Sequence, residues 1–326
     1  MHAPCVLPNS SAMSILVSLA AVAFVATPPA PRSASITQSH APLIGRWDLV
    51  IDSKDRHTAG WLEVRHSGVN MLVGAYVGTT GSARPISRVD FKDGNFRFTI
   101  PPQWNPAEGD NTFTGELKGD SITGTISYAN GKSEAFRGAR APSLRRAAAP
   151  VWGAPVKLLA GKDLSGWKAL GDAPSQWELV DGVLRNKKGG ADLVTEKSYD
   201  DFKLHVEFRY PKGSNSGVYL RGRYEVQVED TPSREPMIDG IGSIYGHLMP
   251  NAMAALGPDT WQTYDITLVG RRVTVVLNGK TIISDTDIPG ITGGAIDSNE
   301  GAPGPIFLQG DHGPVEYRNI IITPAK

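Results

Sequence analysis

Short runs in which apolar and polar residues alternate occupy much of the first half of the chain. Phe96, Phe98 and Ile100 alternate with polar neighbours, and Ile122 and Ile126 lie in a second run of the same kind. Alternation with a period of two is typical of half-buried antiparallel strands. Turn pairs that contain glycine separate such runs: Ser67-Gly68, Asp93-Gly94, Gly119-Asp120 and Asn130-Gly131. Residues 41–140 are therefore predicted to form a small domain of about eight antiparallel strands, as a barrel or a compact sandwich.

Alternation continues in residues 155–326, which read as a second and larger β domain. The run Phe202–Phe208 alternates apolar residues with charged residues and a histidine, and the run Val273–Leu277 leads into the turn pair Asn278-Gly279. We find no convincing pattern for a helix of three turns. Two antiparallel sheets packed face to face would bury these apolar faces, as in a jelly roll. The predicted fold class is therefore all-β.

The segment that joins the two domains has a different composition. Residues 141–154 contain prolines, alanines and the pair Arg145-Arg146, without any periodic apolar face. Such a composition is typical of an exposed linker, in which the paired arginines are expected to be solvated.

Residues 1–40 are predicted to be a signal peptide and leader. The apolar run Ala12–Ala26 is short for a membrane span, and small residues and prolines follow it. Because no Lys or Arg precedes this run, an uncleaved anchor is the alternative. Export would place the mature protein in the periplasm or outside the cell, without membrane contact after the leader is removed. The single cysteine, Cys5, would leave with the leader, so no disulfide is expected.

Charge and standard motifs exclude several functions. The chain has 33 basic and 33 acidic residues, a formal net charge of +0, so no nucleic-acid partner is expected. It contains no phosphate-binding glycine loop, no His-Glu-x-x-His, no Gly-x-Ser-x-Gly and no zinc-type Cys/His spacing. A ligand site must therefore come from polar residues that a sheet gathers on one face.

Residues 215–230 are the best candidate for such a face. They read as two strands joined at Gly222-Arg223. A stacking ring with paired donors and acceptors on a sheet suits a sugar, whereas the alternative is a solvated outer face with cross-strand ion pairs. The side chains predicted to lie opposite the apolar core are Tyr219, Arg221, Glu225, Gln227 and Glu229.

Two histidines in glycine-flanked loops are candidates for proton transfer. His247 follows Gly246, and His312 precedes Gly313. The pKa of a free histidine suits proton transfer near neutral pH, although an exposed loop histidine is the simpler interpretation of either one. Carboxylates such as Glu225 could act as acid or base, although most strand carboxylates are structural.

The end of the chain carries the most informative motif. A Gln-Gly-Asp-His-Gly turn, residues 309–313, lies between two apolar runs, as in functional loops held by a rigid sheet. Together with other segments it resembles, in order, the 3-keto-disaccharide hydrolase family. The resemblance covers residues 156–324 and leaves out the N-terminal domain. The other matching segments are Leu159–Trp167, Trp177–Leu184, Leu193–Thr195, Tyr199–Leu204, Asn215–Arg221, Tyr224–Val228, Ile244–Gly246, Trp261–Ile266 and Asn278-Gly279.

This resemblance implies a concanavalin-like jelly roll and a glycoside-cleaving enzyme. Its substrates would be glycosides that a separate sugar 3-dehydrogenase has already oxidised at C3. A 3-keto group acidifies the proton on C2, so a base can remove it, an enolate forms, the glycosidic oxygen leaves by elimination, and water adds back. Such a site needs a base near C2, a cation or donor on the enolate oxygen and an acid for the leaving group.

Carried onto this sequence, the resemblance implies a role for four ionisable residues. Glu225 or His247 would be the base, and Arg221 would stabilise the enolate. Asp230 would orient Arg221 or His247. No cofactor is implied with certainty, although a divalent metal could replace the arginine. Its competent ligands would be Glu225, Asp230, His247 and His312.

The resemblance also implies which residues hold the sugar. Tyr219 or Tyr245 would stack on the ring. Since one fold can carry different functions, a non-catalytic carbohydrate-binding module is the alternative, but so many ionisable residues favour an enzyme. The residues that would bind the sugar hydroxyl groups are Asn215, Gln227, Gln309 and His312.

Overall fold

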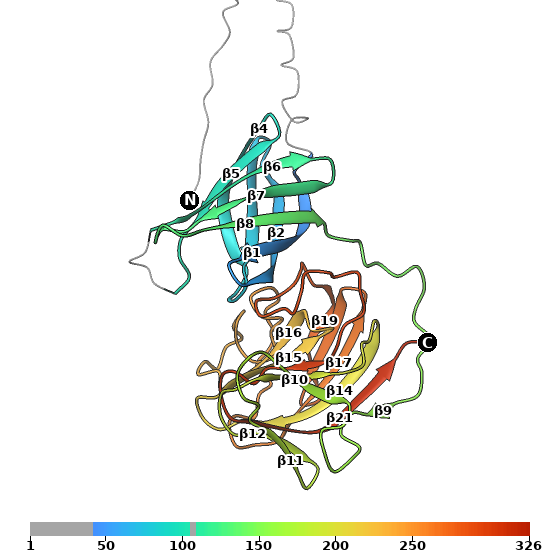
Figure 1. The fold of residues 1–326 in the computed structure, drawn as a ribbon. Coiled ribbons are helices and arrows are strands. Elements are labelled where there is room, and N and C mark those ends of the chain that lie inside the picture. The colour runs from blue at the N-terminus through green and yellow to red at the C-terminus, as the bar shows by residue number, and fades with distance from the viewer. Residues whose placement is uncertain (1–41, 105–108) are drawn as a thin grey trace, which may run out of the picture. The chain divides into compact units, whose positions relative to one another are not determined.

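The computed structural model describes residues 42–104 and 109–326. The predicted leader, with Cys5, lies outside these residues. Within them, all regular elements are β-strands, so the predicted all-β class is confirmed (Figure 1). No helix in this described part of the chain is long and apolar enough to cross a membrane.

The first eight strands close into an antiparallel barrel, each paired with its neighbour in the chain (Figure 1). Of the two architectures predicted for this region, the barrel is the one that forms, and closure leaves no free sheet edge. The strands are β1 (Gly45–Ser53), β2 (Arg56–Ser67), β3 (Met71–Val77), β4 (Arg84–Lys92), β5 (Asn95–Ile100), β6 (Asn111–Lys118), β7 (Ser121–Ser127) and β8 (Ser133–Arg140).

Aromatic rings fill the barrel where glycine leaves room for them. A Cβ atom on Gly115 would lie 2.4 Å from Cζ of Phe96, and one on Gly124 would lie 2.6 Å from Cζ of Phe136. Both rings are buried. The alternation of residues 95–100 therefore places large side chains inside, and glycines on the adjacent strands make space for them.

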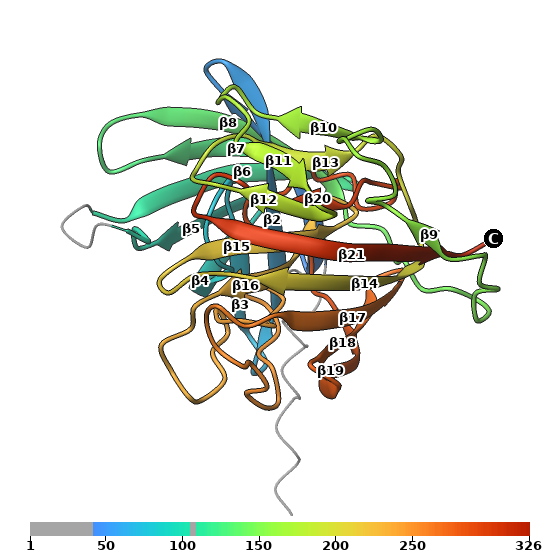
Figure 2. The ribbon, with the colours of Figure 1, turned by 90° about the horizontal axis from the view of Figure 1, so that it is seen from below.

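The remaining strands form two antiparallel sheets. One has the order β10-β13-β20-β15-β16, and the other the order β11-β12-β21-β14-β17-β18-β19 with β9 paired to β21. Figure 2 shows β21, β14 and β17 running side by side. The strands are β9 (Val156–Lys157), β10 (Trp167–Leu170), β11 (Trp177–Val180), β12 (Val183–Asn186), β13 (Asp192–Thr195), β14 (Phe202–Arg209), β15 (Asn215–Leu220), β16 (Tyr224–Glu229), β17 (Gln262–Val269), β18 (Arg272–Leu277), β19 (Lys280–Asp287), β20 (Phe307–Leu308) and β21 (Val315–Pro324).

A continuous apolar core lies between these sheets. Phe208 stacks on Tyr264 with ring centroids 4.5 Å apart, and both rings are completely buried. Val218 and Val226 contribute the apolar faces of β15 and β16. The polar faces of the same two strands are thereby directed away from the core. The ligand site was predicted on these polar faces.

Residues 42–104 and 109–326 belong to one compact unit. The barrel residues Ala59, Trp61 and Val77 pack into the same apolar cluster as the sandwich core. A Cβ atom on Gly290 would lie 2.2 Å from Nε1 of Trp61, so no side chain fits there.

The segment between the barrel and the sandwich is bound to its surroundings more firmly than its composition predicts. Arg146 donates hydrogen bonds to Asp200 at 2.6 Å and to Asp201 at 2.7 Å. Both paired arginines are exposed, as the sequence predicted, and the guanidinium of Arg146 is in addition paired with two carboxylates.

Candidate functional site

A polar hollow of about 190 Å³ lies against strands β15 and β16 and the closing turn. It brings together Glu225 and all six residues predicted to bind sugar. Loop residues that the sequence analysis did not single out complete it. The lining consists of Thr80, Gly81, Trp104, Asn215, Tyr219, Glu225, Gln227, Tyr245, Gly293, Gly294, Gln309, Asp311 and His312.

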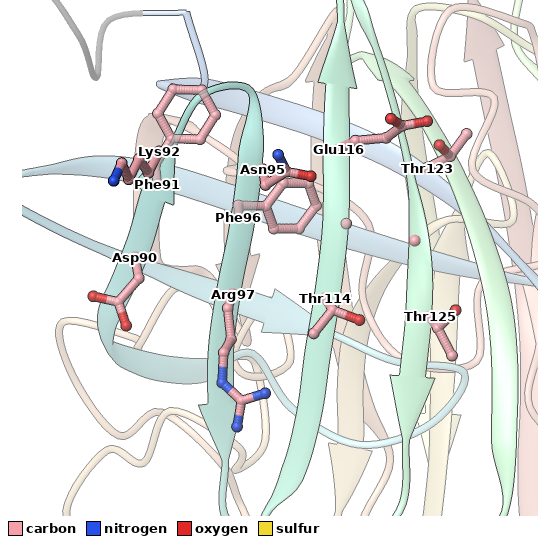
Figure 3. A pocket seen from close by; sticks show the side chains of 12 residues that line it. Asp90, Phe91, Lys92, Asn95, Phe96, Arg97, Thr114, Glu116, Thr123 and Thr125 are labelled. Carbon is pink, nitrogen blue, oxygen red and sulfur yellow. The ribbon is translucent and has the colours of Figure 1, made fainter.

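A larger hollow on the barrel contains none of the predicted site residues. It has a volume of about 710 Å³ and lies over β4 to β7, where Figure 3 shows Arg97, Thr114 and Thr125 on three successive strands. Asp90 and Arg97 are register partners and both are exposed. The larger hollow is therefore an open surface with solvated side chains, and we place the candidate site at the smaller hollow.

The pairing of β15 with β16 positions Glu225. Tyr219 is its register partner, and the two side chains lie 2.9 Å apart between Oη and Oε2. A Cβ atom on Gly217 would lie 2.3 Å from Oε1 of Glu225, so glycine makes room for the carboxyl group. Glu225 is 3% exposed, and this burial raises its pKa to about 8.

The hydroxyl group of Tyr219 links that carboxyl group to the backbone. It lies 2.9 Å from the carbonyl oxygen of Gly293 as well as 2.9 Å from Glu225. A protonated Glu225 can donate to Tyr219, which then donates to Gly293. An ionised Glu225 can instead accept from Tyr219. The same contacts therefore serve both protonation states of Glu225, as a proton-transfer group requires.

The closing turn supplies a side chain that can carry a positive charge, His312. Nδ1 of His312 pairs with Oδ1 of Asp311, and this bond raises the pKa of His312, with further contributions from Glu225 and Asp192. His312 is the only residue in the lining that can be cationic. A buried carboxyl group with a raised pKa beside an imidazolium is typical of a site of acid–base chemistry.

Gln309 is held with an unused acceptor. Its backbone N–H donates to the carbonyl oxygen of Gly217 at 3.0 Å, and its carbonyl oxygen accepts from Ser216 at 2.7 Å. Its side-chain Oε1 is buried and has no hydrogen-bond partner within residues 42–104 and 109–326. A hydroxyl group of a bound sugar would satisfy this oxygen.

The two tyrosines differ in what they can offer a sugar. The ring of Tyr219 is buried and stacks on Phe307 with centroids 4.2 Å apart. Tyr219 is therefore not available to stack on a sugar, and its hydroxyl group orients Glu225 instead. Tyr245 is half-buried in the lining, and burial raises its pKa to about 12, so it remains a neutral phenol.

Arg221 does not reach this hollow. Its side chain is fully buried and donates to Asp200 at 3.1 Å, to the hydroxyl group of Tyr224 at 3.1 Å and to the carbonyl oxygen of Gly270 at 3.0 Å. Strand β15 ends at Leu220, and Arg221 has a left-handed backbone with φ of 52°. The alternation of the strand therefore ends at Leu220 and does not include Arg221. The predicted role of Arg221 as enolate stabiliser is corrected to a structural one.

His247 and Asp230 also lie outside the lining. Nε2 of His247 lies 2.9 Å from the carbonyl oxygen of Ile291, and its ring meets the edge of Trp61 at 5.3 Å. Burial lowers the pKa of His247 to about 4, so it is neutral at physiological pH. Asp230 accepts from the backbone of Gly213 at 2.8 Å. Neither residue is therefore placed to act on a ligand in the hollow.

Metal-ligating side chains do not cluster within the described ranges. No group of three or more His, Cys, Asp or Glu residues in them is arranged to hold a metal ion. The four ligands considered from the sequence are separated, since only Glu225 and His312 line the hollow.

Some lining residues were missed by the sequence analysis. Asp311 precedes His312 in the closing motif, so its position in the turn was a usable signal. Asp192 is outside this lining but is bonded to the closing turn: it accepts from the backbone of Gly310 at 2.8 Å, and burial raises its pKa to about 6. Trp104 and Thr80 come from barrel loops, where no periodic pattern marked them.

The fold and the site define a two-sheet β-sandwich with a polar, acid–base hollow of a size that suits one sugar ring. Residues 154–323 match the family described as the 3-keto-alpha-glucoside-1,2-lyase-like domain. This match covers just over half of the chain, so the chain belongs to that family. The family membership predicted from the sequence motifs is confirmed.

Individual relatives cover smaller parts. The 3-keto-disaccharide hydrolase of Bacteroides thetaiotaomicron is 31% identical over 86 residues, which are 23% of this chain and 29% of that protein. The match thus spans less than a third of that relative.

Two solved structures are also similar. A candidate glycosyl hydrolase from Parabacteroides distasonis is 33% identical, with a TM-score of 0.45, covering 52% of this chain and 82% of that one. The carbohydrate-binding module CBM66 from Bacillus subtilis is 10% identical, with a TM-score of 0.34, covering 48% and 95%.

Proposed function

We propose that the protein cleaves 3-keto-glycosides by elimination followed by hydration. The observation that carries this proposal is the buried carboxyl group of Glu225, with a pKa of about 8, in a sugar-sized hollow beside His312. A base whose pKa lies near the working pH is well matched to a proton that a neighbouring ketone has acidified. A non-catalytic binding module has no need of such a group.

In the proposed reaction, ionised Glu225 removes the proton from C2 of the oxidised sugar. The electron pair of the C2–H bond forms the enolate, whose negative oxygen is stabilised by the imidazolium of His312. The enolate then expels the glycosidic oxygen from C1, and Glu225 returns its proton to that oxygen. Water adds to C1 of the resulting C1–C2 double bond, and a solvent proton is added at C2.

Two other lining residues would hold the oxidised ring. Oε1 of Gln309 is placed to accept from a hydroxyl group, and the phenol of Tyr245 can donate to one. The amide of Gln227 is already engaged, because its Oε1 accepts from the backbone of Val228 at 2.9 Å and its Nε2 donates to Asp239 at 3.3 Å. Gln227 would therefore contribute shape more than hydrogen bonding.

Deuterium labelling tests this mechanism directly. Elimination breaks the C2–H bond, whereas ordinary glycoside hydrolysis does not. Cleavage of a 3-keto-disaccharide in deuterated water is expected to place deuterium on C2 of the released keto sugar, as read by mass spectrometry or NMR. The controls are the unoxidised disaccharide, a sample without enzyme to measure spontaneous exchange, and a sample with chelator. Turnover without enzyme-dependent exchange at C2 would exclude elimination, and binding without turnover would instead support a carbohydrate-binding module.

We also propose that a sugar 3-dehydrogenase supplies the substrate, because the reaction depends on a C3 ketone. An unoxidised glycoside has no acidified C2 proton. The disaccharide alone is therefore expected to remain intact, and its cleavage is expected to begin when a sugar 3-dehydrogenase and its electron acceptor are added. Equal cleavage with and without the dehydrogenase would contradict this dependence.

Export is a further part of the proposal. The apolar run Ala12–Ala26, with the small residues and prolines after it, supports a cleaved leader. The intact mass of the mature protein is expected to match a start between Ala26 and Ser39, in a periplasmic or extracellular fraction. Full-length protein recovered from the cytoplasm would reject export.

A further inference from the structure

The barrel lines the same hollow as the sandwich. Thr80 and Gly81, in the loop after β3, and Trp104, after β5, contribute to it alongside Glu225. These barrel residues precede residue 154, where the family match begins. The site therefore contains a component that the matched domain alone does not provide.

Close backbone contacts fix the barrel loop against the sandwich. The backbone N–H of Gly294 donates to the carbonyl oxygen of Thr79 at 2.9 Å. A Cβ atom on Gly293 would lie 2.3 Å from the carbonyl oxygen of Gly81, and one on Gly246 would lie 2.5 Å from Cβ of Ser82. Glycines at these positions permit an approach that side chains would prevent, so the loop is an integral wall of the hollow.

The segment that carries Trp104 is anchored to the same loop. Arg84 donates to the carbonyl oxygen of Pro101 at 2.9 Å, and the side chain of Gln103 lies 3.5 Å from the hydroxyl group of Ser82. Trp104 itself is 72% exposed. A large aromatic ring held at the edge of a polar hollow, with its surface in water, is suited to stack on the apolar face of a sugar.

A second hollow adjoins the first through Thr80 and Trp104. It has a volume of about 310 Å³ and lies at one end of the barrel. Asn111 and Tyr128 are among its lining residues, together with Arg84, whose guanidinium lies over the ring of Tyr76. Nε of Arg84 is buried and has no hydrogen-bond partner in the part of the chain that the structure describes. Aromatic rings, amides and an unused donor are the groups that bind a hydroxyl-rich ligand.

We infer that this barrel hollow is the subsite for the leaving-group unit of the substrate, with Trp104 as its stacking surface. The inference rests on the proposed function. The hollow around Glu225, at about 190 Å³, has room for one ring, whereas pockets that hold larger ligands have roughly 300–1,000 Å³. The alcohol part of a disaccharide must therefore extend beyond it. Two hollows share lining residues with it: the barrel hollow, through Thr80 and Trp104, and one of about 410 Å³, through Thr80, Gly294 and Asp311. The barrel hollow is the one with an exposed aromatic ring, Trp104, at its junction with the site.

Two substrates that share the oxidised ring test this inference. One is a 3-keto-disaccharide and the other is the methyl 3-keto-glycoside, whose leaving group is too small to reach the barrel. Trp104→Ala is expected to lower kcat/KM for the disaccharide about tenfold more than kcat/KM for the methyl glycoside, because binding of a remote part of the substrate contributes only where that part exists. Val69→Ala, at a barrel residue that is 70% exposed and outside both hollows, is the matched control and is expected to change neither.

Equal losses on both substrates, or no loss on the disaccharide, would overturn the inference. If the wild-type protein cleaves neither substrate, the proposed function fails, and calorimetric titration tests the subsite by itself. Trp104→Ala is then expected to weaken binding of the unoxidised disaccharide about tenfold more than binding of its monosaccharide. Unchanged affinity for the disaccharide would show that no such subsite exists.

Discussion

Glu225→Gln is expected to lower turnover of a 3-keto-disaccharide by about 10²–10⁴-fold, the usual contribution of a general base, while the protein stays folded. Glutamine has nearly the same shape but cannot accept the C2 proton. Its amide can keep the contact with the hydroxyl group of Tyr219, which lies 2.9 Å from Oε2 in the wild type. Initial rates with the purified variant measure the loss, and deuterium exchange at C2 is expected to be lost in parallel.

Glu229→Gln is the matched control for this substitution. Glu229 lies on the same strand, β16, and two alternations further along the same face, but outside the hollow. Its pKa is also raised by burial. Its variant is expected to keep wild-type turnover. Full activity of Glu225→Gln, whatever the activity of Glu229→Gln, would show that another group removes the proton from C2.

The pH dependence of the wild-type enzyme follows from Glu225 and His312. Burial raises the pKa of Glu225 to about 8, so the ionised base becomes more abundant as the pH rises towards 8. His312 must stay protonated, and its pKa is raised by Asp311. We expect kcat/KM to rise from pH 6 towards 8, as Glu225 loses its proton. A profile that is flat from pH 6 to 8 would contradict the assignment of Glu225.

The parts of this structure that local patterns control could be predicted from the sequence. Alternation identified the strands, and the pairing of β15 with β16 follows from the turn at Gly222-Arg223. The closing motif located Gln309 and His312 because these residues lie in one tight turn. Such features depend on neighbours in the chain, so the period-two rule and turn chemistry are enough to find them.

The remaining assignments failed where contacts between distant residues decide. Arg221 follows the alternation in the sequence, but its left-handed backbone turns its side chain towards Asp200 and Gly270. His247 is in a glycine loop, yet Trp61 from the barrel covers it. Trp104 reaches the hollow from the other half of the chain. None of these contacts leaves a periodic signal in the sequence.

A pair of carboxyl groups, of the buried Glu300 and the half-buried Asp48, leads to the second large effect. Glu300 accepts from the hydroxyl group of Tyr224 at 2.8 Å, and Arg271 lies 3.4 Å from its other oxygen. Burial, and then the electrostatic effect of Glu300, raise the pKa of Asp48 to about 9. Oδ1 of Asp48 and Oε2 of Glu300 are both buried, and neither oxygen forms a hydrogen bond with the described residues that meets normal geometry. One proton on Asp48 allows it to donate to Glu300.

This proton makes the folded state less stable as the pH rises. The ordinary pKa of Asp48, 3.8, applies to the unfolded chain, so between about pH 4 and 9 the folded protein holds one proton more. The stabilisation is fully present below pH 4 and is lost as the pH rises through 9, at up to about 1.4 kcal/mol per pH unit. Asp48→Asn supplies a permanent donor, so it is expected to reduce the fall in unfolding free energy between pH 6 and 9 by up to about 4 kcal/mol.

Urea denaturation at pH 6, 7, 8 and 9 measures this difference, and Asp52→Asn on the same strand is the control. A hydrogen bond from Arg137 lowers the pKa of Asp52, so its contribution is lost only as the pH falls into the acid range. Its variant is expected to keep the wild-type slope above pH 6. Glu225 titrates in the same window, but it is present in all three proteins and its contribution cancels in the comparison. If the free energy of unfolding of Asp48→Asn and of the wild type depends on pH in the same way, Asp48 is ionised in the folded protein. The assignment of a shared proton between Asp48 and Glu300 would then be wrong.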